Sequence, residues 1–92
     1  MKIRVKTFAR FRELVRTDLE IELPDGGTVL DGVTRLASTA SGAKEALLDE
    51  NGNIRSHVIV MVNKRRLPNR DREQEVLHDG DELAIFPPVA GG

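Results

Sequence analysis

Strict alternation of apolar and charged residues marks two segments near the start of the chain. In residues 2–8, Ile3 and Val5 alternate with basic residues, and in residues 18–23 leucine and isoleucine alternate with acidic residues. A period of two places one type of side chain on each face, which is typical of a strand with one buried face. We therefore predict two half-buried strands that pair as a hairpin over residues 9–17.

One longer segment has the periodicity of a helix. Thr28 stands where a helix cap is expected, Asp31 follows three residues later, and apolar residues recur at helical spacing, which predicts an amphipathic helix over residues 29–39. The other expected elements are a short helix in 43–48, a strand buried on most sides at 57–62, a turn with a short edge strand at 63–68, a loop or single helical turn at 69–75, and a last strand at 82–86. One helix across one face of a mixed sheet of four to five strands buries both apolar faces, so an α+β fold in two layers is predicted.

Composition narrows the classes of function. The 92 residues predict one domain, residues 1–86, followed by a flexible functional tail, residues 87–92. Fourteen basic and fifteen acidic residues give a net charge of −1, so neither nucleic acid nor a membrane is an expected partner. The absence of cysteine excludes disulfides and thiolate nucleophiles, and we expect a cytoplasmic location because no apolar run is long enough to span a bilayer.

The C-terminal tail is the candidate functional element. Its residues are Pro87, Pro88, Val89, Ala90, Gly91 and Gly92. Two prolines favour an extended chain that stands off the body, and six extended residues reach about 20 Å. Glycines lack Cβ, so a partner can close around their backbone and a reagent can approach the carbonyl. We predict that the carboxylate of Gly92 carries the chemistry.

Two groups of polar residues are alternative candidate sites. His57 and His78 lack carboxylates at the spacing of a metal site, so no metal is expected. Asp79, Asp81 and Glu82 resemble an acid/base group, but a tight turn and a solvated strand start explain them more simply. Catalysis by side chains is not expected.

Two further segments have a structural and a functional interpretation. Residues 24–28 could form an anion-binding nest at a helix start, but no Lys-Ser/Thr pair follows, which favours a turn and a cap. Arg65, Arg66, Arg70 and Arg72 form a basic run interleaved with acidic residues. We interpret this run as a solvated loop, and a docking contact with an acidic partner is the alternative.

Three stretches resemble a known family. They are Phe8-Ala9-Arg10-Phe11-Arg12-Glu13-Leu14, then Val62-Asn63, and then Asp79-Gly80-Asp81-Glu82-Leu83-Ala84-Ile85-Phe86-Pro87-Pro88-Val89-Ala90-Gly91-Gly92. They resemble the MoaD/ThiS group of ubiquitin-like sulfur carriers and the small archaeal modifier proteins, and the last stretch is most similar to the small subunit of molybdopterin synthase. The resemblance implies a β-grasp fold. Residues 40–56 depart from the pattern, being longer than in compact bacterial carriers.

The resemblance also implies a mechanism. An activating enzyme that uses ATP and Mg²⁺ adenylates the carboxylate of Gly92, and a sulfur donor converts it to a thiocarboxylate for molybdopterin synthesis. The implied partners are this enzyme and the large subunit of molybdopterin synthase, while the chain itself binds no cofactor and is not an enzyme. The alternative is a protein modifier joined through Gly92 to lysines of target proteins. A third alternative is a binding domain with an inert tail.

A partner-binding patch is expected at the base of the tail. If Leu83 and Ile85 face the helix, Ala84 and Phe86 face outward. The resemblance to ubiquitin adds Phe8 and Val60 to the same outward patch, and the tail from Pro87 to Ala90 continues it. The alternative is that the loop 67–78 covers this patch.

Overall fold

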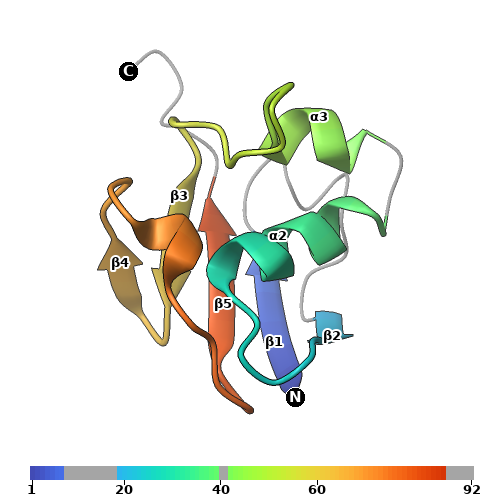
Figure 1. Cartoon of the computed structure of the whole chain (residues 1–92), viewed down its shortest axis with the longest axis vertical. Helices are drawn as coiled ribbons and strands as arrows, with labels where there is room; N and C mark the ends of the chain where they lie inside the picture. Colours follow the sequence, from blue (N-terminus) through green and yellow to red (C-terminus); the bar gives the residue numbers. More distant parts are fainter. Residues whose placement is uncertain (8–18, 40–41, 87–92) are drawn as a thin grey trace.

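The computed structural model describes residues 1–7, 19–39 and 42–86 (Figure 1). The elements in chain order are β1 (Lys2–Thr7), β2 (Leu19–Glu22), α2 (Val29–Ala37), α3 (Ala43–Leu47), β3 (Ile59–Val62), β4 (Arg65–Leu67), the 3-10 turn η1 (Arg72–Gln74) and β5 (Glu82–Phe86). These elements match the predicted order. The third strand starts at Ile59 rather than at His57, because Val58 N donates to Arg55 O and closes a turn immediately before it.

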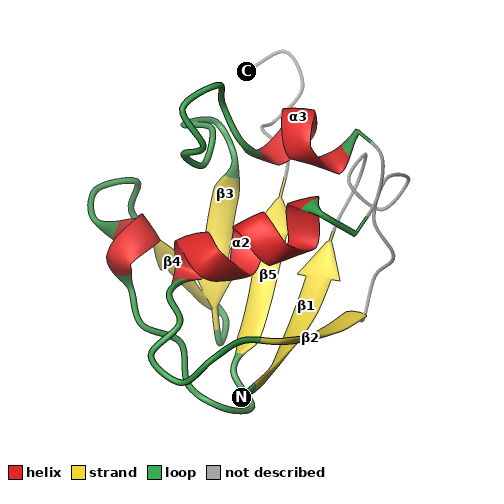
Figure 2. Cartoon of the chain, turned by 45° about the vertical axis from the view of Figure 1, so that its right-hand side comes forward, coloured by secondary structure: helices red, strands yellow, loops and turns green. Residues whose placement is uncertain are grey.

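The strands form one mixed sheet in the order β2-β1-β5-β3-β4. β1 and β2 pair antiparallel, with Ile3 opposite Ile21, which confirms the predicted hairpin. β5 lies in the centre, where it runs parallel to β1 and antiparallel to β3. The helices α2 and α3 lie on one side of this sheet (Figure 2). The predicted two-layer α+β arrangement is therefore confirmed.

Helix α2 packs its apolar side on the sheet. Thr28 caps it, since its side chain accepts from Asp31 N while the Asp31 carboxylate accepts from Thr28 N, as the sequence predicted. Val33 and Leu36 on this side are fully buried. Gly32 lets the helix approach β5 closely, because a Cβ at this position would lie 3.1 Å from Leu83 Cδ2. The helix ends at Ala37, two residues before the predicted end at 39.

The turn η1 and the loop before it hold the long connection between α3 and β3. The Arg72 guanidinium donates to Arg55 O at 2.9 Å and to Val58 O. Glu73 accepts a hydrogen bond from Ile54 N. The interpretation of the charged stretch as solvated is therefore wrong for Arg72, which is 4% exposed, because backbone carbonyls replace its water.

Candidate functional site

The tail follows the central strand of the sheet. β5 ends at Phe86, and residues 87–92, including Gly91 and Gly92, lie outside the described residues. β5 is hydrogen bonded to β1 on one side and to β3 on the other. The chemistry predicted at the Gly92 carboxylate stays a prediction, and its attachment point is a strand fixed on both sides.

Phe86 lies on the face of the sheet opposite α2. Leu83 and Ile85 are fully buried toward the helix, as predicted, so the residues that alternate with them face the other way. Phe86 is half-buried there and pairs with Ile59 of β3. Ala84 shares this face but is only 7% exposed, because the neighbouring strands on both sides crowd its small side chain.

The prediction that Val60 faces outward is wrong. Val60 is fully buried and pairs with Ile85, so it belongs to the core under the helices. Its neighbours Ile59 and Met61 occupy the outward positions and are half-buried. Sequence reasoning missed them because the strand is apolar on both faces, so a period of two gave no sign of which face is buried. Phe8 lies outside the described residues.

The loop 67–78 does not cover this outward face in the described part of the chain. Val76 forms a bridge with Thr28, and Val29 N donates to Glu75 O at 2.8 Å. These contacts hold the loop and η1 beside α2, on the helical side of the sheet (Figure 1). We call the four outward apolar residues of β3 and β5 the outer patch: Ile59, Met61, Ala84 and Phe86.

Asn63 joins the β3–β4 turn to the start of β5. Its side-chain Nδ2 donates to Asp81 Oδ1 at 2.9 Å, and its Oδ1 accepts from Glu82 N at 3.0 Å. Burial tends to raise the pKa of Asp81, but hydrogen bonds from Asn63 and from His78 outweigh it and hold the pKa below its ordinary value. Asp81 therefore stabilises the turn before β5, as the sequence indicated.

The segment 24–28 is a turn and a helix cap rather than an anion-binding nest. Gly27 N donates to Pro24 O at 3.0 Å, and Thr28 N donates to the Asp31 carboxylate at 2.9 Å. Both N–H groups are therefore engaged within the protein, which leaves neither for an anion.

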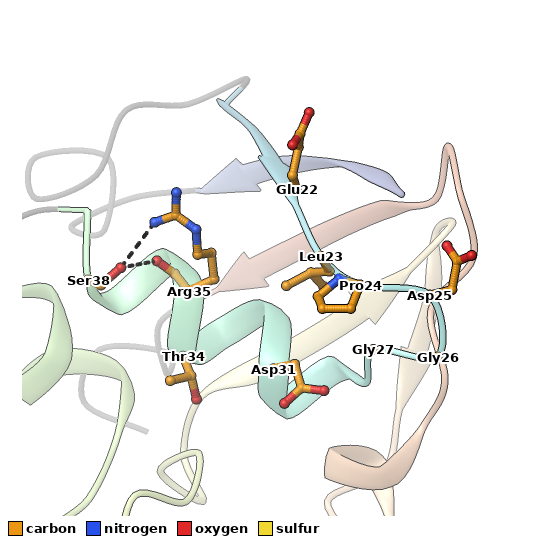
Figure 3. A pocket seen from close by; sticks show the side chains of 10 residues that line it. All are labelled: Glu22, Leu23, Pro24, Asp25, Gly26, Gly27, Asp31, Thr34, Arg35 and Ser38. Atoms are coloured by element: carbon orange, nitrogen blue, oxygen red, sulfur yellow. Dashed lines mark hydrogen bonds between the residues drawn. The ribbon is translucent and has the colours of Figure 1, made fainter.

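A groove of about 550 Å³ runs between this turn and α2 (Figure 3). It is lined by Glu22, Leu23, Pro24, Asp25, Gly26, Gly27, Asp31, Thr34, Arg35 and Ser38. Arg35 is the cation that lines this groove. Its guanidinium donates to Oγ of Ser38, the C-cap residue of α2, at 3.2 Å. Because the cation and the Asp31 carboxylate already serve the ends of α2, the groove does not present a set of converging ligand-binding groups.

Within residues 1–7, 19–39 and 42–86, no three His, Asp or Glu side chains gather as they would around a metal ion. In the same ranges no helix has the length and apolarity needed to cross a membrane.

The sequence matches known proteins along nearly its whole length. The model of the ThiS family matches residues 5–92. Small archaeal modifier protein 3 of Haloferax volcanii is 36% identical over 93 residues, which cover 100% of both chains. The molybdopterin synthase sulfur carrier subunit of Escherichia coli K12 is 39% identical over 90 residues, which cover 98% of this chain and 99% of that one.

The structure also matches a solved protein over its full length. The crystal structure of SAMP1 from Haloferax volcanii superimposes with a TM-score of 0.86 and 26% identity, covering 100% of both chains. The arrangement of five strands and one main helix is thus shared with a protein of known structure.

Proposed function

The chain belongs to the ThiS family and has its ubiquitin-like β-grasp fold, and on this basis we propose that it is a sulfur carrier that acts through the carboxylate of Gly92. The observation that carries the proposal is the match to residues 5–92, which includes the diglycine end. Relatives named as sulfur carrier subunits of molybdopterin synthase support a role in molybdopterin biosynthesis.

The proposed reaction begins with activation of a poor electrophile. A C-terminal carboxylate has a reference pKa of about 3.3–3.7, so it is ionised at pH 7 and resists attack. One carboxylate oxygen of Gly92 attacks the α-phosphorus of ATP in a partner enzyme, and pyrophosphate leaves. A sulfide-level nucleophile then attacks the carbonyl and AMP leaves, which gives a thiocarboxylate. The chain itself supplies the carboxylate and the docking surface, so we propose that it is a carrier and not the catalyst.

The proposed partners are an adenylating enzyme that uses ATP and Mg²⁺ and the large subunit of molybdopterin synthase. The names of the relatives as synthase subunits support the second partner. The outer patch supports a docking role, because two of its residues, Ala84 and Phe86, lie on the strand that leads directly into the tail.

A second function is favoured by a specific relative. The Haloferax volcanii protein that is 36% identical is named a small archaeal modifier protein. The same adenylate can be attacked by a lysine amine, which releases AMP and forms an isopeptide bond. We therefore propose modification of target proteins as the alternative, with Gly92 in the same role.

Intact-mass analysis of the protein purified from its own host distinguishes the two functions. Replacement of one oxygen by sulfur at the C-terminus marks the carrier, and diglycine remnants on lysines of other proteins mark the modifier. A variant that lacks Gly91 and Gly92 should lose adenylation and every downstream transfer. It should keep its urea midpoint, because the hydrophobic core comes from residues between Ile3 and Ile85. Transfer that persists in this variant would refute the proposal.

A further inference from the structure

The register of the sheet fixes what surrounds the outer patch. On β4, Arg66 lies opposite Met61, so it stands on the outer face next to the patch. On β1, Lys6 lies opposite Ala84 and borders the patch from the other side. The apolar centre is therefore flanked by a cation on each side.

The four arginines of the basic run have different environments. Arg65 pairs with Glu75 at 3.1 Å, Arg72 is buried, and Arg70 lies 3.9 Å from Asp71 in a loop on the helical side. Arg66 is exposed and, among the described residues, has no carboxylate within ion-pair distance. Of these four arginines, Arg66 is the one that lies on the outer face without an ion pair.

Lys64 provides a second cation at the same edge. It ends the two-residue turn between β3 and β4, where Asn63 and Lys64 have φ values of 51° and 69°. Positive φ at both positions is the pattern of a type I′ turn, which favours Asn-Gly. Lysine at the glycine position is strained, and backbone strain of this kind occurs preferentially at functional sites.

The turn presents Lys64 from a fixed position. Three hydrogen bonds join Asn63 to the start of β5. Its side chain donates to Asp81 and accepts from Glu82 N, and its backbone N donates to Glu82 O at 2.9 Å. Lys64 and Arg4 line a hollow of about 170 Å³ together with Asn63 and Glu82. The Glu82 carboxylate in this hollow lies 4.0 Å from Arg4, while Lys64 has no ion pair among the described residues.

The positive charge is unbalanced at one edge of the outer face. On the β1–β2 side, Lys2 and Arg4 lie opposite Glu22 and Glu20. Arg4 and Lys6 also share Glu82, at 4.0 Å and 3.6 Å. On the β3–β4 side Arg65 pairs with Glu75, but no carboxylate of the described chain lies within ion-pair distance of Lys64 or Arg66. The chain as a whole carries a net charge of −1, so this edge differs in sign from the average surface.

We infer that Lys64 and Arg66 form a cationic rim beside the outer patch, and that the surface which docks there is an acidic protein surface with an apolar centre. The inference rests on the proposed function, because it describes the adenylating enzyme that must hold this face while it acts on Gly92. A protein fits better than a nucleic acid, because the centre is aliphatic around one phenylalanine and the chain has no Trp or Tyr for base stacking.

The test uses the full chain and the host's adenylating enzyme. Isothermal titration gives Kd as a function of salt, and ATP–pyrophosphate exchange at saturating carrier gives the maximal rate. We expect Lys64→Gly and Arg66→Ser each to raise Kd about fivefold at low salt and much less at 0.5 M salt, whose short Debye length of roughly 4 Å screens such pairs. The maximal exchange rate should be unchanged. Lys44→Ser, an exposed cation on α3, is the matched control and should leave Kd unchanged.

Lys64→Gly separates docking from folding. Relief of the positive φ should raise its melting temperature by about 2–6 °C while its affinity falls, so lost binding cannot result from unfolding. Unchanged Kd in both rim variants, with exchange intact, overturns the rim and leaves the proposed function standing. Absence of exchange in the unaltered chain overturns the proposed function instead. A mixed-sequence single-stranded oligonucleotide that binds as tightly as the enzyme, and loses affinity in the same variants, overturns the assignment to a protein.

Discussion

Arg72 is a charged residue that works as part of the interior. Burial lowers the pKa of its guanidinium, but the group remains charged at neutral pH because the ordinary value is so high. Its hydrogen bonds reach the carbonyls of Arg55 and Val58, which flank the turn before β3. One side chain thereby fixes the chain path into the strand that carries half of the outer patch.

Arg72→Ala should lower the free energy of unfolding by at least about 2 kcal/mol, because it removes charged hydrogen bonds and leaves buried carbonyls without donors. Arg70→Ala is the control, since that side chain is 92% exposed and its ion pair contributes at most about 0.5 kcal/mol. Urea unfolding of both variants measures the difference. Equal small losses would show that water replaces the guanidinium.

Asp81 should make the stability of the fold fall at acid pH. Its folded pKa lies below the ordinary value, so it binds a proton more readily in the unfolded chain. The stabilisation is therefore fully present well above the unfolded pKa of about 3.9, and it is lost as pH falls through the folded pKa. We expect Asp81→Asn to lose less stability than the unaltered chain between about pH 5 and pH 3. Parallel acid slopes in urea titrations would contradict this assignment.

At the scale of elements, α2 has one side in the core and one in solvent. Leu36→Ala should cost about 2–5 kcal/mol, because Leu36 is fully buried against the sheet and its loss leaves a cavity. Thr34→Ala, on the exposed side of the same helix, should change stability by less than about 0.5 kcal/mol. Denaturant unfolding tests the pair. A cost below about 1 kcal/mol at Leu36 would mean that the interior collapses around the gap.

At the scale of the whole molecule, the sheet separates the core from the proposed docking face. Phe86→Ala should weaken binding to the adenylating enzyme by at least about 2 kcal/mol, because aromatic anchors dominate such interfaces, while the free chain loses less than about 1 kcal/mol of stability. Val60 follows Ile59, the partner of Phe86 on β3, and lies on the buried face, so Val60→Ala should lose at least about 1.5 kcal/mol of stability with little change in affinity. Calorimetry and urea unfolding measure both effects. If Phe86→Ala instead loses stability and keeps its affinity, Phe86 belongs to the core.

The sequence by itself determined the elements, the cap at Thr28, the hairpin of β1 and β2, and the inward side of β5, because each follows from local periodicity or from side-chain hydrogen bonds within three residues. Only the tertiary structure decided the face of β3, the burial of Arg72 and the separation of Arg66 from the other arginines. The first and the third depend on strand register, and the burial of Arg72 depends on contacts with residues 14 or more positions away, such as Val58. A strand that is apolar on both faces has the same sequence pattern whichever face is buried. An arginine in a polar loop likewise has the same sequence neighbours whether it is buried or exposed. The difference arises only when the distant segments pack together.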